Sequence, residues 1–583
     1  MLCKGSIGVR VKKTEYMFVF AVFWIVTMCL CPQAALDPTH TIVGDAQSDL
    51  WDHLWGYWRT EKSIFWFGEY PLEEDYINYP KGGILYHVDF LNSLIMIPIR
   101  TIFGMVLGYN LLICVQMSAA GTAMYALTRR FVYSHLGGFL AAFVFVFNPQ
   151  MLTFTLASGV ANRLNLVWIP LFFIAIDLWV RYHRLKGVVL APIFCFLAAI
   201  GCWHYAYYIF MLTLVLSVCT MLYSCTRLDR LWFWTKKWIP IAILCAAVLL
   251  PVSLLASASI SSEDGTQMVQ REHTMFWDGV SDLSLLNDFA LLDYVQIFHS
   301  GPMKSANFDL LYETPYVGWG LLLLAPLALF SRKKLVWILL LGAVYFLILS
   351  LGTDILILHG SEKIPSIVFA ISARVIPFMT AQEVPWEYII PANFCLSVAL
   401  AFFVDVLLQG VEKWRRWSIG IQVVAIFLME MIFISPVLLP IPSTHVSYSS
   451  FYKQLREDPR PFAVFDFPSR RDKSNLLPTE FFFYQSLHYR PIPYAIMDAW
   501  IDKNEFWGEL TRTQQSGGMR SFNFSNGDKE QAKRVLKKYG YKYFLLHKKL
   551  MSDFSSPLFL SLFSDMFGEP VFEDDYLWAF EVY

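Results

Sequence analysis

Long apolar runs separated by short polar turns dominate the first three quarters of the chain. A bilayer core about 30 Å thick requires roughly 20 apolar residues per helix. On that measure the pattern predicts transmembrane helices near residues 16–34, 88–107, 109–128, 136–155, 164–181, 187–204, 205–225, 238–256, 316–331, 334–352, 387–409 and 417–439. The expected fold is therefore an α-helical polytopic membrane protein with about 12 or 13 spans.

Basic residues set the predicted orientation of these spans. Lys and Arg gather in turns between alternate pairs of spans, at residues 181–186, 227–237, 332–334 and 413–416. Because positively charged turns stay in the cytoplasm, these turns and the N-terminus are predicted to be cytoplasmic. The loops at residues 35–83 and 257–315, and everything after residue 440, are then expected outside.

One basic pair conflicts with this count. Counting forward from the first span places Arg129 and Arg130 outside, whereas their charge favours the cytoplasm. Proline interrupts a helix, and a broken span is tolerated where protein lines it. We therefore predict a break or an extra half-span at Asn148 and Pro149, which restores the orientation of the later spans.

The pattern changes after the proline-rich stretch 436–442, and the tail has the character of a soluble domain. Residues 464–467 and 541–547 predict short strands, and residues 529–540 predict a helix closed by Gly540. We expect two domains, a membrane domain over residues 1–440 and an extracytoplasmic α/β domain over residues 441–583.

Composition excludes several function classes. The 583 residues are 56% hydrophobic and 16% charged, with a net charge of −1, and no basic patch suggests a nucleic-acid partner. The ten cysteines contain no CxxC pair, which is typical of small apolar residues in helices. Nucleotide-binding glycine loops, HExxH and GxSxG are absent from the sequence.

The most unusual polar stretch is GDAQSDLWDHLWGYW, residues 44–58, in the first predicted outside loop. On an ideal helix Asp45, Asp49 and Asp52 share one face, and the tryptophans at 51, 55 and 58 form a second stripe. One interpretation is an interfacial helix with its tryptophans among the lipid headgroups. The other gives one aspartate the role of a catalytic base.

Several short motifs favour the catalytic interpretation by resemblance, and the interfacial helix stays open as the alternative. They are Gly44-Asp45 with Asp49, Tyr79–Gly83, Asp89 with Leu91-Asn92, Glu313–Gly318, Leu349–Gly352 and Phe567–Pro570. Together they resemble the GT-C superfamily of polytopic glycosyltransferases, most of all bacterial members with an outward-facing C-terminal domain. The resemblance covers most of the chain and implies residence in the bacterial inner membrane.

The resemblance also implies a reaction. GT-C enzymes transfer a sugar from a polyprenyl-phosphate carrier to a lipid, glycan or protein acceptor on the outer side of the membrane. Their catalytic base is an aspartate of the first outside loop, which corresponds here to Asp45. The sequence has no clear Asp-X-Asp motif, so it identifies no certain cofactor and leaves a divalent metal open.

The remaining candidates follow from the chemistry of such a transfer. A carboxylate must remove the acceptor's proton, and the departing phosphate needs a positive partner. Asp49 is the second catalytic candidate after Asp45. The candidate substrate-binding residues are Asp52, His53, Asp89, Arg163, Arg271, His273 and Arg374. Glu430, an ionisable residue inside a predicted span, is either functional or paired within the protein.

Two other classes of protein remain open at this point. A secondary transporter would place its acidic residues near the bilayer midplane, whereas here they concentrate in the outside loops. A non-catalytic envelope protein would have no need for the aspartate cluster at residues 45–52.

Overall fold

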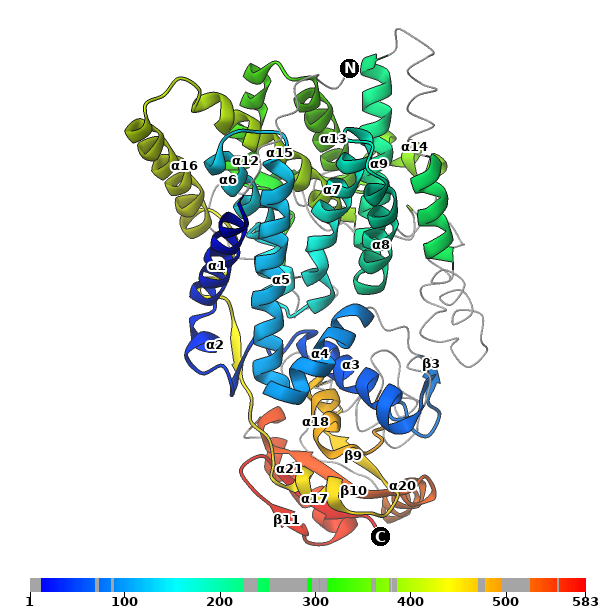
Figure 1. Cartoon of the computed structure of the whole chain (residues 1–583). Coiled ribbons are helices and arrows are strands. Elements are labelled where there is room, and N and C mark those ends of the chain that lie inside the picture. The colour runs from blue at the N-terminus through cyan, green and yellow to red at the C-terminus, as the bar shows by residue number, and fades with distance from the viewer. Residues whose placement is uncertain are drawn as a thin grey trace. The chain divides into compact units, whose positions relative to one another are not determined.

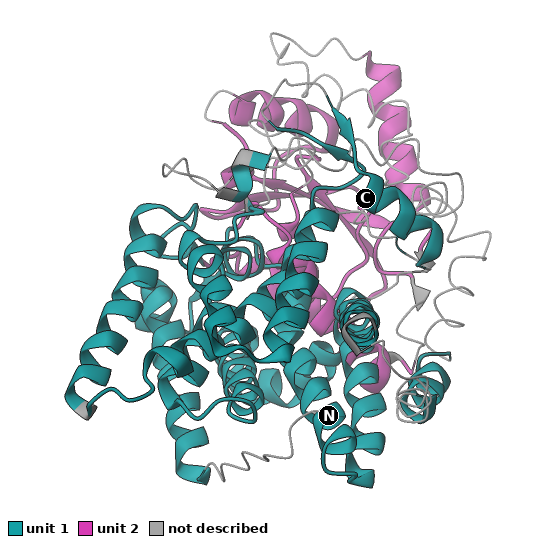
Figure 2. Ribbon diagram, turned by 90° about the horizontal axis from the view of Figure 1, so that it is seen from above, with its two compact units in different colours: residues 1–45, 88–256, 273–444 teal, residues 46–87, 257–272, 445–583 magenta. Residues whose placement is uncertain are grey.

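The structure is a computed structural model of the whole chain. It describes residues 12–68, 73–84, 89–224, 239–250, 291–295, 303–304, 312–357, 363–376, 379, 385–469, 478–494, 525–552 and 555–583. The chain divides into two compact units (Figure 2). Unit 1 comprises Met1–Asp45, Val88–Ala256 and His273–Thr444, and unit 2 comprises Ala46–His87, Ser257–Glu272 and His445–Tyr583.

Unit 1 is a helical assembly (Figure 1). Its described helices are α1 Lys13–Leu30, α2 Pro32–Leu36, α4 Phe90–Phe103, α5 Met105–Thr128, α6 His135–Val146, η2 Met151–Ala157, η3 Ala161–Val167, α7 Trp168–Val180, α8 Leu185–Gly201, α9 Trp203–Ser224, η6 Leu291–Val295, α12 Trp319–Leu324, η7 Ala325–Ser331, α13 Lys334–Ser350, α14 Ile367–Val375, η9 Pro385–Tyr388, α15 Ile389–Leu407 and α16 Lys413–Phe433. Its short strand pairs are β1 Thr41–Val43 with β8 Ser443–His445, β4 Met303–Lys304 with β5 Tyr312–Glu313, and β6 Asp354–Ile355 with β7 Ile364–Pro365.

Close packing joins these helices into one core. Helix α5 packs against α1 and α6, and α15 packs against α6 and α13. A Cβ atom at Gly121 of α5 would lie 2.3 Å from the ring of Phe23 in α1, so the absence of a side chain at this position permits the contact. Phe23 is fully buried and stacks on Phe147 with 5.3 Å between ring centroids.

Unit 1 holds all the candidate membrane spans found among the described residues. Six helices are long and apolar enough to cross a bilayer, and a bent pair makes a seventh. Shorter apolar helices are Phe90–Phe103, Leu185–Gly201, Ile239–Leu250, Trp319–Ser331 and Lys334–Ser350. A polytopic helical membrane protein is thus confirmed, while the count of 12 or 13 spans stays a prediction.

The predicted break at Asn148 and Pro149 is confirmed. Helix α6 and the π-helix η2 form the bent pair, at an angle of 50°. Proline supplies no backbone N–H to continue α6. The side chain of Asn148 replaces the lost bonds, because its Nδ2 donates to the Phe145 carbonyl at 2.7 Å and its Oδ1 accepts from the Met151 N–H at 3.0 Å.

Unit 2 contains a four-stranded sheet. Its described elements are α3 Leu50–Lys62, η1 Ser63–Phe67, β2 Glu73–Glu74, β3 Gly83–Ile84, α17 Phe451–Glu457, β9 Ala463–Phe467, α18 Glu480–His488, α20 Asn526–Lys538, β10 Tyr541–His547, η11 Lys548–Leu550, α21 Ser555–Phe567, β11 Phe572–Glu573 and β12 Leu577–Glu581. The sheet order is β11-β12-β10-β9, with β10 parallel to β9 and antiparallel to β12.

Side-chain alternation along β10 gives this sheet two buried faces. Phe544 packs on Phe563 of α21, with 4.3 Å between ring centroids. The next residue, Leu545, belongs to a core cluster with Phe451 and Leu455 of α17. Both strands predicted in the tail are confirmed, as is the helix that ends before Gly540, whose φ of +78° lies in the left-handed region.

The predicted boundary at residue 440 stays a prediction, because contacts divide the chain differently. Residues 46–87 belong to the same compact unit as the tail. Tyr541 donates a hydrogen bond from its hydroxyl to the Tyr79 carbonyl at 2.6 Å, and Asn78 N–H donates to the Tyr494 carbonyl. The tail therefore completes its fold with an early segment of the chain.

Candidate functional site

Asp45 lies beside the end of the bent pair formed by α6 and η2. The N–H of Gly44 donates to the Pro442 carbonyl at 2.9 Å, and Thr444 Oγ1 donates to the Gly44 carbonyl at 2.7 Å. Gly44 has φ +119°, a conformation that favours glycine. The N–H of Asp45 donates to the Ala157 carbonyl at 2.8 Å, at the last residue of η2. The backbone thus fixes Asp45, whose side chain is half-buried.

The predicted single helix through the three aspartates is wrong. Helix α3 begins at Leu50, so Asp45 lies before it, Asp49 occupies its N-cap position and only Asp52 lies in its first turn. Asp45 belongs to unit 1, whereas Asp49 and Asp52 belong to unit 2. Helical periodicity could not show this, because backbone contacts with distant segments hold Asp45 out of the helix.

The carboxyl groups of Asp49 and Asp52 share a poorly solvated environment in unit 2. Burial raises the pKa of Asp49 to about 6. Burial, and then the neighbouring charges of Asp49 and Glu480, raise the pKa of Asp52 well above its usual range. His53 is half-buried in the same turn, and its N–H donates to the Asp49 carbonyl at 3.4 Å. Near neutral pH Asp52 can therefore keep its proton, whereas Asp49 is mostly ionised.

The tryptophans of α3 do not lie among lipid headgroups. Trp51, Trp55 and Trp58 are 3%, 1% and 0% exposed. They pack on helix α18 and the residue that follows it. Trp55 Nε1 donates to Gln485 Oε1 at 2.6 Å, and the Trp51 ring lies 4.9 Å from that of Phe483 between centroids. The interpretation of α3 as an interfacial helix is wrong, because the tail covers its aromatic face.

Asp89 is the centre of a buried hydrogen-bond network in unit 1. It is fully buried and precedes helix α4. Asn92 Nδ2 donates to Asp89 Oδ2 at 3.2 Å, and Asn165 Nδ2 donates to Asp89 Oδ1 at 3.1 Å. Gln116 Nε2 donates to Asn92 Oδ1 at 2.8 Å. These contacts hold α4, α5 and η3 together.

Arg163 forms a buried ion pair. Its Nη2 lies 2.6 Å from Glu387 Oε1, and the two side chains are 6% and 0% exposed. Tyr208 donates its hydroxyl hydrogen to Glu387 Oε2 at 2.9 Å. Tyr205 donates to the Arg163 carbonyl at 2.6 Å. The charge of Arg163 is thus neutralised within unit 1, which leaves it poorly suited to bind a departing phosphate.

The other predicted cationic residues differ in their placement. Arg271 and His273 lie outside the described residues, as does most of the loop 257–315. Arg374 lies in the last turn of α14 and is exposed. Of the predicted arginine candidates in the described part of the chain, Arg374 is therefore the accessible one.

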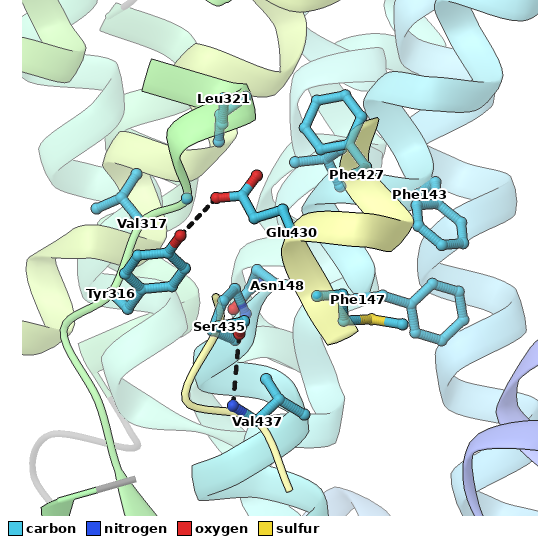
Figure 3. A pocket seen from close by; sticks show the side chains of 14 residues that line it. Phe143, Phe147, Asn148, Tyr316, Val317, Leu321, Phe427, Glu430, Ser435 and Val437 are labelled. Atoms are coloured by element: carbon cyan, nitrogen blue, oxygen red, sulfur yellow. Dashed lines mark hydrogen bonds between the residues drawn. The ribbon is translucent and has the colours of Figure 1, made fainter. Parts of the chain in front are cut away.

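A cavity of about 40 Å³ lies at the bend between α6 and η2 (Figure 3). Glu430 of α16 points into it. One carboxylate oxygen accepts from the Tyr316 hydroxyl at 2.5 Å and from the Trp319 N–H, and the other accepts from the Gly320 N–H at 2.8 Å. Of the two interpretations of Glu430, the contacts favour the paired one, because the carboxylate joins α16 to the start of α12.

Two carboxylates of these networks were absent from the sequence-based candidates. Glu387 lies in PWEY, directly before a span, and an ionisable residue beside an apolar segment is a detectable signal. Glu480 opens helix α18 in the tail, and its proximity to Asp52 has no local signal.

Several solved structures align with this chain over most of its length. The oligosaccharyltransferase of Archaeoglobus fulgidus, tethered with an acceptor peptide, aligns with a TM-score of 0.51 at 13% identity, over 92% of this chain and 69% of that one. The arabinofuranosyltransferase AftD from Mycobacteria gives 0.48 at 12% identity, over 92% and 37%. ArnT from Cupriavidus metallidurans, in the apo state, gives 0.46 at 10%, over 98% and 97%. No protein-family model and no curated protein matches the sequence.

The alignment with the oligosaccharyltransferase shows that this chain has a fold similar to that of this membrane enzyme. The predicted resemblance in fold is confirmed, and the protein is an integral, multi-pass membrane protein with a small strand-containing C-terminal region.

The donor groups of the described chain bear on metal binding. The Archaeoglobus fulgidus oligosaccharyltransferase has been solved in complex with Zn and sulfate. In the part of this chain that the structure describes, no group of three or more His, Cys, Asp or Glu side chains is arranged to hold a metal ion.

Proposed function

We propose that this protein transfers a sugar from a polyprenyl-phosphate-linked donor to an acceptor on the extracytoplasmic side of the membrane, with Asp45 as general base. The observation that carries the proposal is the position of Asp45. Its backbone is hydrogen-bonded to the end of the bent span, and its carboxylate is half-buried. A general base needs a fixed position and access to a substrate proton, and this arrangement provides both.

The chemistry requires one proton transfer and one displacement. The Asp45 carboxylate accepts the proton of the acceptor hydroxyl as its oxygen bonds to the anomeric carbon. The bond between that carbon and the phosphate oxygen breaks, and the electron pair leaves with the lipid phosphate. A positioned base contributes about 10²- to 10⁴-fold to such a rate.

The leaving phosphate gains negative charge and requires a cation. We assign this role to Arg374, because its side chain is exposed whereas that of Arg163 is paired with Glu387. Guanidinium binds phosphate through paired hydrogen bonds, which a lysine cannot reproduce in geometry. Arg374→Lys is accordingly expected to raise the KM for the donor while leaving some transfer.

Orientation and location form part of the same proposal. The basic turns place residues 35–83 and the tail outside, which is where a lipid-carried donor meets its acceptor. The soluble domain over residues 441–583 would then face outward from a bacterial inner membrane. Protease added outside intact spheroplasts is expected to cleave the tail, and complete protection would reverse the orientation.

The decisive experiment compares purified wild-type protein with Asp45→Asn in liposomes that contain a polyprenyl-phosphate-linked sugar and candidate acceptors. Wild type is expected to transfer the sugar, and Asp45→Asn to lose at least about 10²-fold in rate. Asp75→Asn, at an exposed aspartate of the same loop, is the matched control and should retain full rate. Full turnover by Asp45→Asn would remove Asp45 as the base.

The same liposomes distinguish the two other classes. A transporter would move solute across the bilayer without consuming the lipid-linked sugar, and a non-catalytic protein would do neither. Either result with wild-type protein would overturn the proposed function.

A further inference from the structure

The segment that follows helix α3 exposes three large apolar side chains. Residues Ser63–Phe67 form the π-helix η1, which ends at Gly68 in a left-handed conformation with φ +63°. Ile64, Phe65 and Trp66 are 39%, 66% and 68% exposed. The preceding helix buries almost all of its residues, so exposure changes abruptly at the start of η1.

This apolar triplet is unusual for its unit. The candidate membrane spans of the described chain all lie in unit 1, so exposed apolar residues are expected in unit 1 but are unusual in unit 2. The other large exposed apolar residues described in unit 2, Tyr448, Val571 and Tyr583, are isolated in the sequence. Three adjacent exposed residues that include Phe and Trp indicate an interaction surface.

Cationic groups adjoin the triplet. Lys62 Nζ lies 3.6 Å from the centroid of the Trp66 ring and 4.6 Å from that of Tyr489. The guanidinium of Arg456 lies 5.7 Å from the Tyr489 centroid. Of these two cations, Arg456 is exposed and available to a negative lipid phosphate, whereas Lys62 is buried. Exposed apolar side chains match the acyl chains that lie beneath such phosphates.

We propose that Ile64, Phe65 and Trp66 insert into the outer surface of the lipid bilayer and anchor unit 2 to it. Connectivity supports a lipid occupant over a separate protein. The chain returns to unit 1 at Val88, and the apolar helix α4 begins at Phe90, so the triplet lies in the segment that leads from α3 to an apolar helix of unit 1. Tryptophan prefers the headgroup region, and burial of the more apolar Ile and Phe side chains away from water is favourable.

The test places a photoreactive aromatic residue at each position. Benzoylphenylalanine replaces Phe65 or Trp66 in the full-length protein, in nanodiscs of pure phospholipid without donor or acceptor. Tyr448 and Tyr583, aromatic residues of unit 2 that are each 49% exposed, provide matched control positions. Mass spectrometry after illumination identifies the partner, and thermal unfolding confirms that each variant is folded.

Lipid adducts at positions 65 and 66 are expected to exceed those at 448 and 583 by at least about tenfold. Equal lipid labelling at all four positions, or crosslinks from 65 and 66 to another part of the protein, would overturn the proposal. The measurement needs no sugar transfer, so its outcome is independent of the proposed function.

Discussion

Arg163 and Glu387 are 224 residues apart in the chain and form a buried ion pair with Nη2 and Oε1 2.6 Å apart. The pair joins η3, which precedes α7, to η9, which precedes α15. Removing two charges from water is costly, and the hydrogen bond from Tyr208 to Glu387 offsets part of that cost. The pair thus ties together the starting segments of two spans.

Breaking this pair should destabilise unit 1. Glu387→Gln leaves the Arg163 charge buried without its counter-charge, and we expect a loss of about 3–5 kcal/mol in the free energy of unfolding. The double variant Arg163→Met, Glu387→Leu removes both charges and should recover most of that loss. Denaturant unfolding in detergent measures both. A single variant as stable as wild type would show that the pair does not hold η3 and η9 together.

Asp49→Asn should stabilise unit 2 above pH 6 and leave transfer intact. The folded pKa of Asp49 is about 6, raised by burial, whereas the unfolded value is near 3.9. The folded state therefore incurs a penalty that grows as the pH rises from about 3.9 to about 6, stays constant above that, and is absent below the unfolded value. We expect a gain of about 1–3 kcal/mol at pH 7.5 and no gain at pH 3.5.

The control for Asp49 is Asp75→Asn, which is exposed and should change neither stability nor rate. A loss of transfer in Asp49→Asn at unchanged stability would make Asp49 the base in place of Asp45.

His488 should make unit 2 sensitive to acid. Burial, together with the charges of Arg490 and His547 and against the opposing charge of Asp466, lowers its pKa to about 4. The unfolded chain binds a proton near pH 6.5, whereas the folded state stays neutral, so stability is fully present above pH 6.5 and falls toward pH 4. The loss should reach roughly 3 kcal/mol.

His488→Asn keeps an acceptor for the Arg490 N–H and should remove this part of the pH dependence. His445→Asn, at an exposed histidine, should leave the dependence unchanged. The measurement is denaturant unfolding at several pH values between 7.5 and 4. If the free energy of unfolding fell equally with decreasing pH in wild type and in His488→Asn, the prediction would be contradicted.

Glu430→Gln should loosen the contact between α16 and α12. Its carboxylate accepts hydrogen bonds from Tyr316, Trp319 and Gly320, and an amide would direct N–H groups toward one set of these donors. We expect a loss of about 1–3 kcal/mol in thermal unfolding measurements. Glu412→Gln, at an exposed residue, should change stability little. An unaltered melting temperature for Glu430→Gln would refute the role of this carboxylate.

Local sequence was sufficient where local chemistry decides the structure. The strand at residues 541–547 is a short apolar run, the helix before Gly540 has the required left-handed residue after it, and the break at Asn148 and Pro149 follows from a missing N–H. Each of these features depends on a few adjacent residues, and each is confirmed.

Sequence was insufficient where long-range contacts decide. The tryptophans of α3 have the same spacing whether lipid or protein covers them, and only the contacts with Phe483 and Gln485 show which applies. From the sequence, Arg163 is a candidate for an available cation. Only the structure shows that it forms an ion pair with Glu387, which lies far along the chain. The assignment of Asp45 rests on the family resemblance and on its position, and it stays a prediction.

Unit 2 is built from segments that lie far apart in the chain, so these segments are synthesised at different times. Residues 46–87 are made early, whereas His445 follows His87 by roughly 360 residues, which takes a ribosome on the order of 20 to 70 s. During that interval Trp51, Trp55 and Trp58 lack the helix α18 that covers them in the finished protein. The nascent segment therefore has to be shielded from aggregation and proteolysis until the last quarter of the polypeptide has been synthesised.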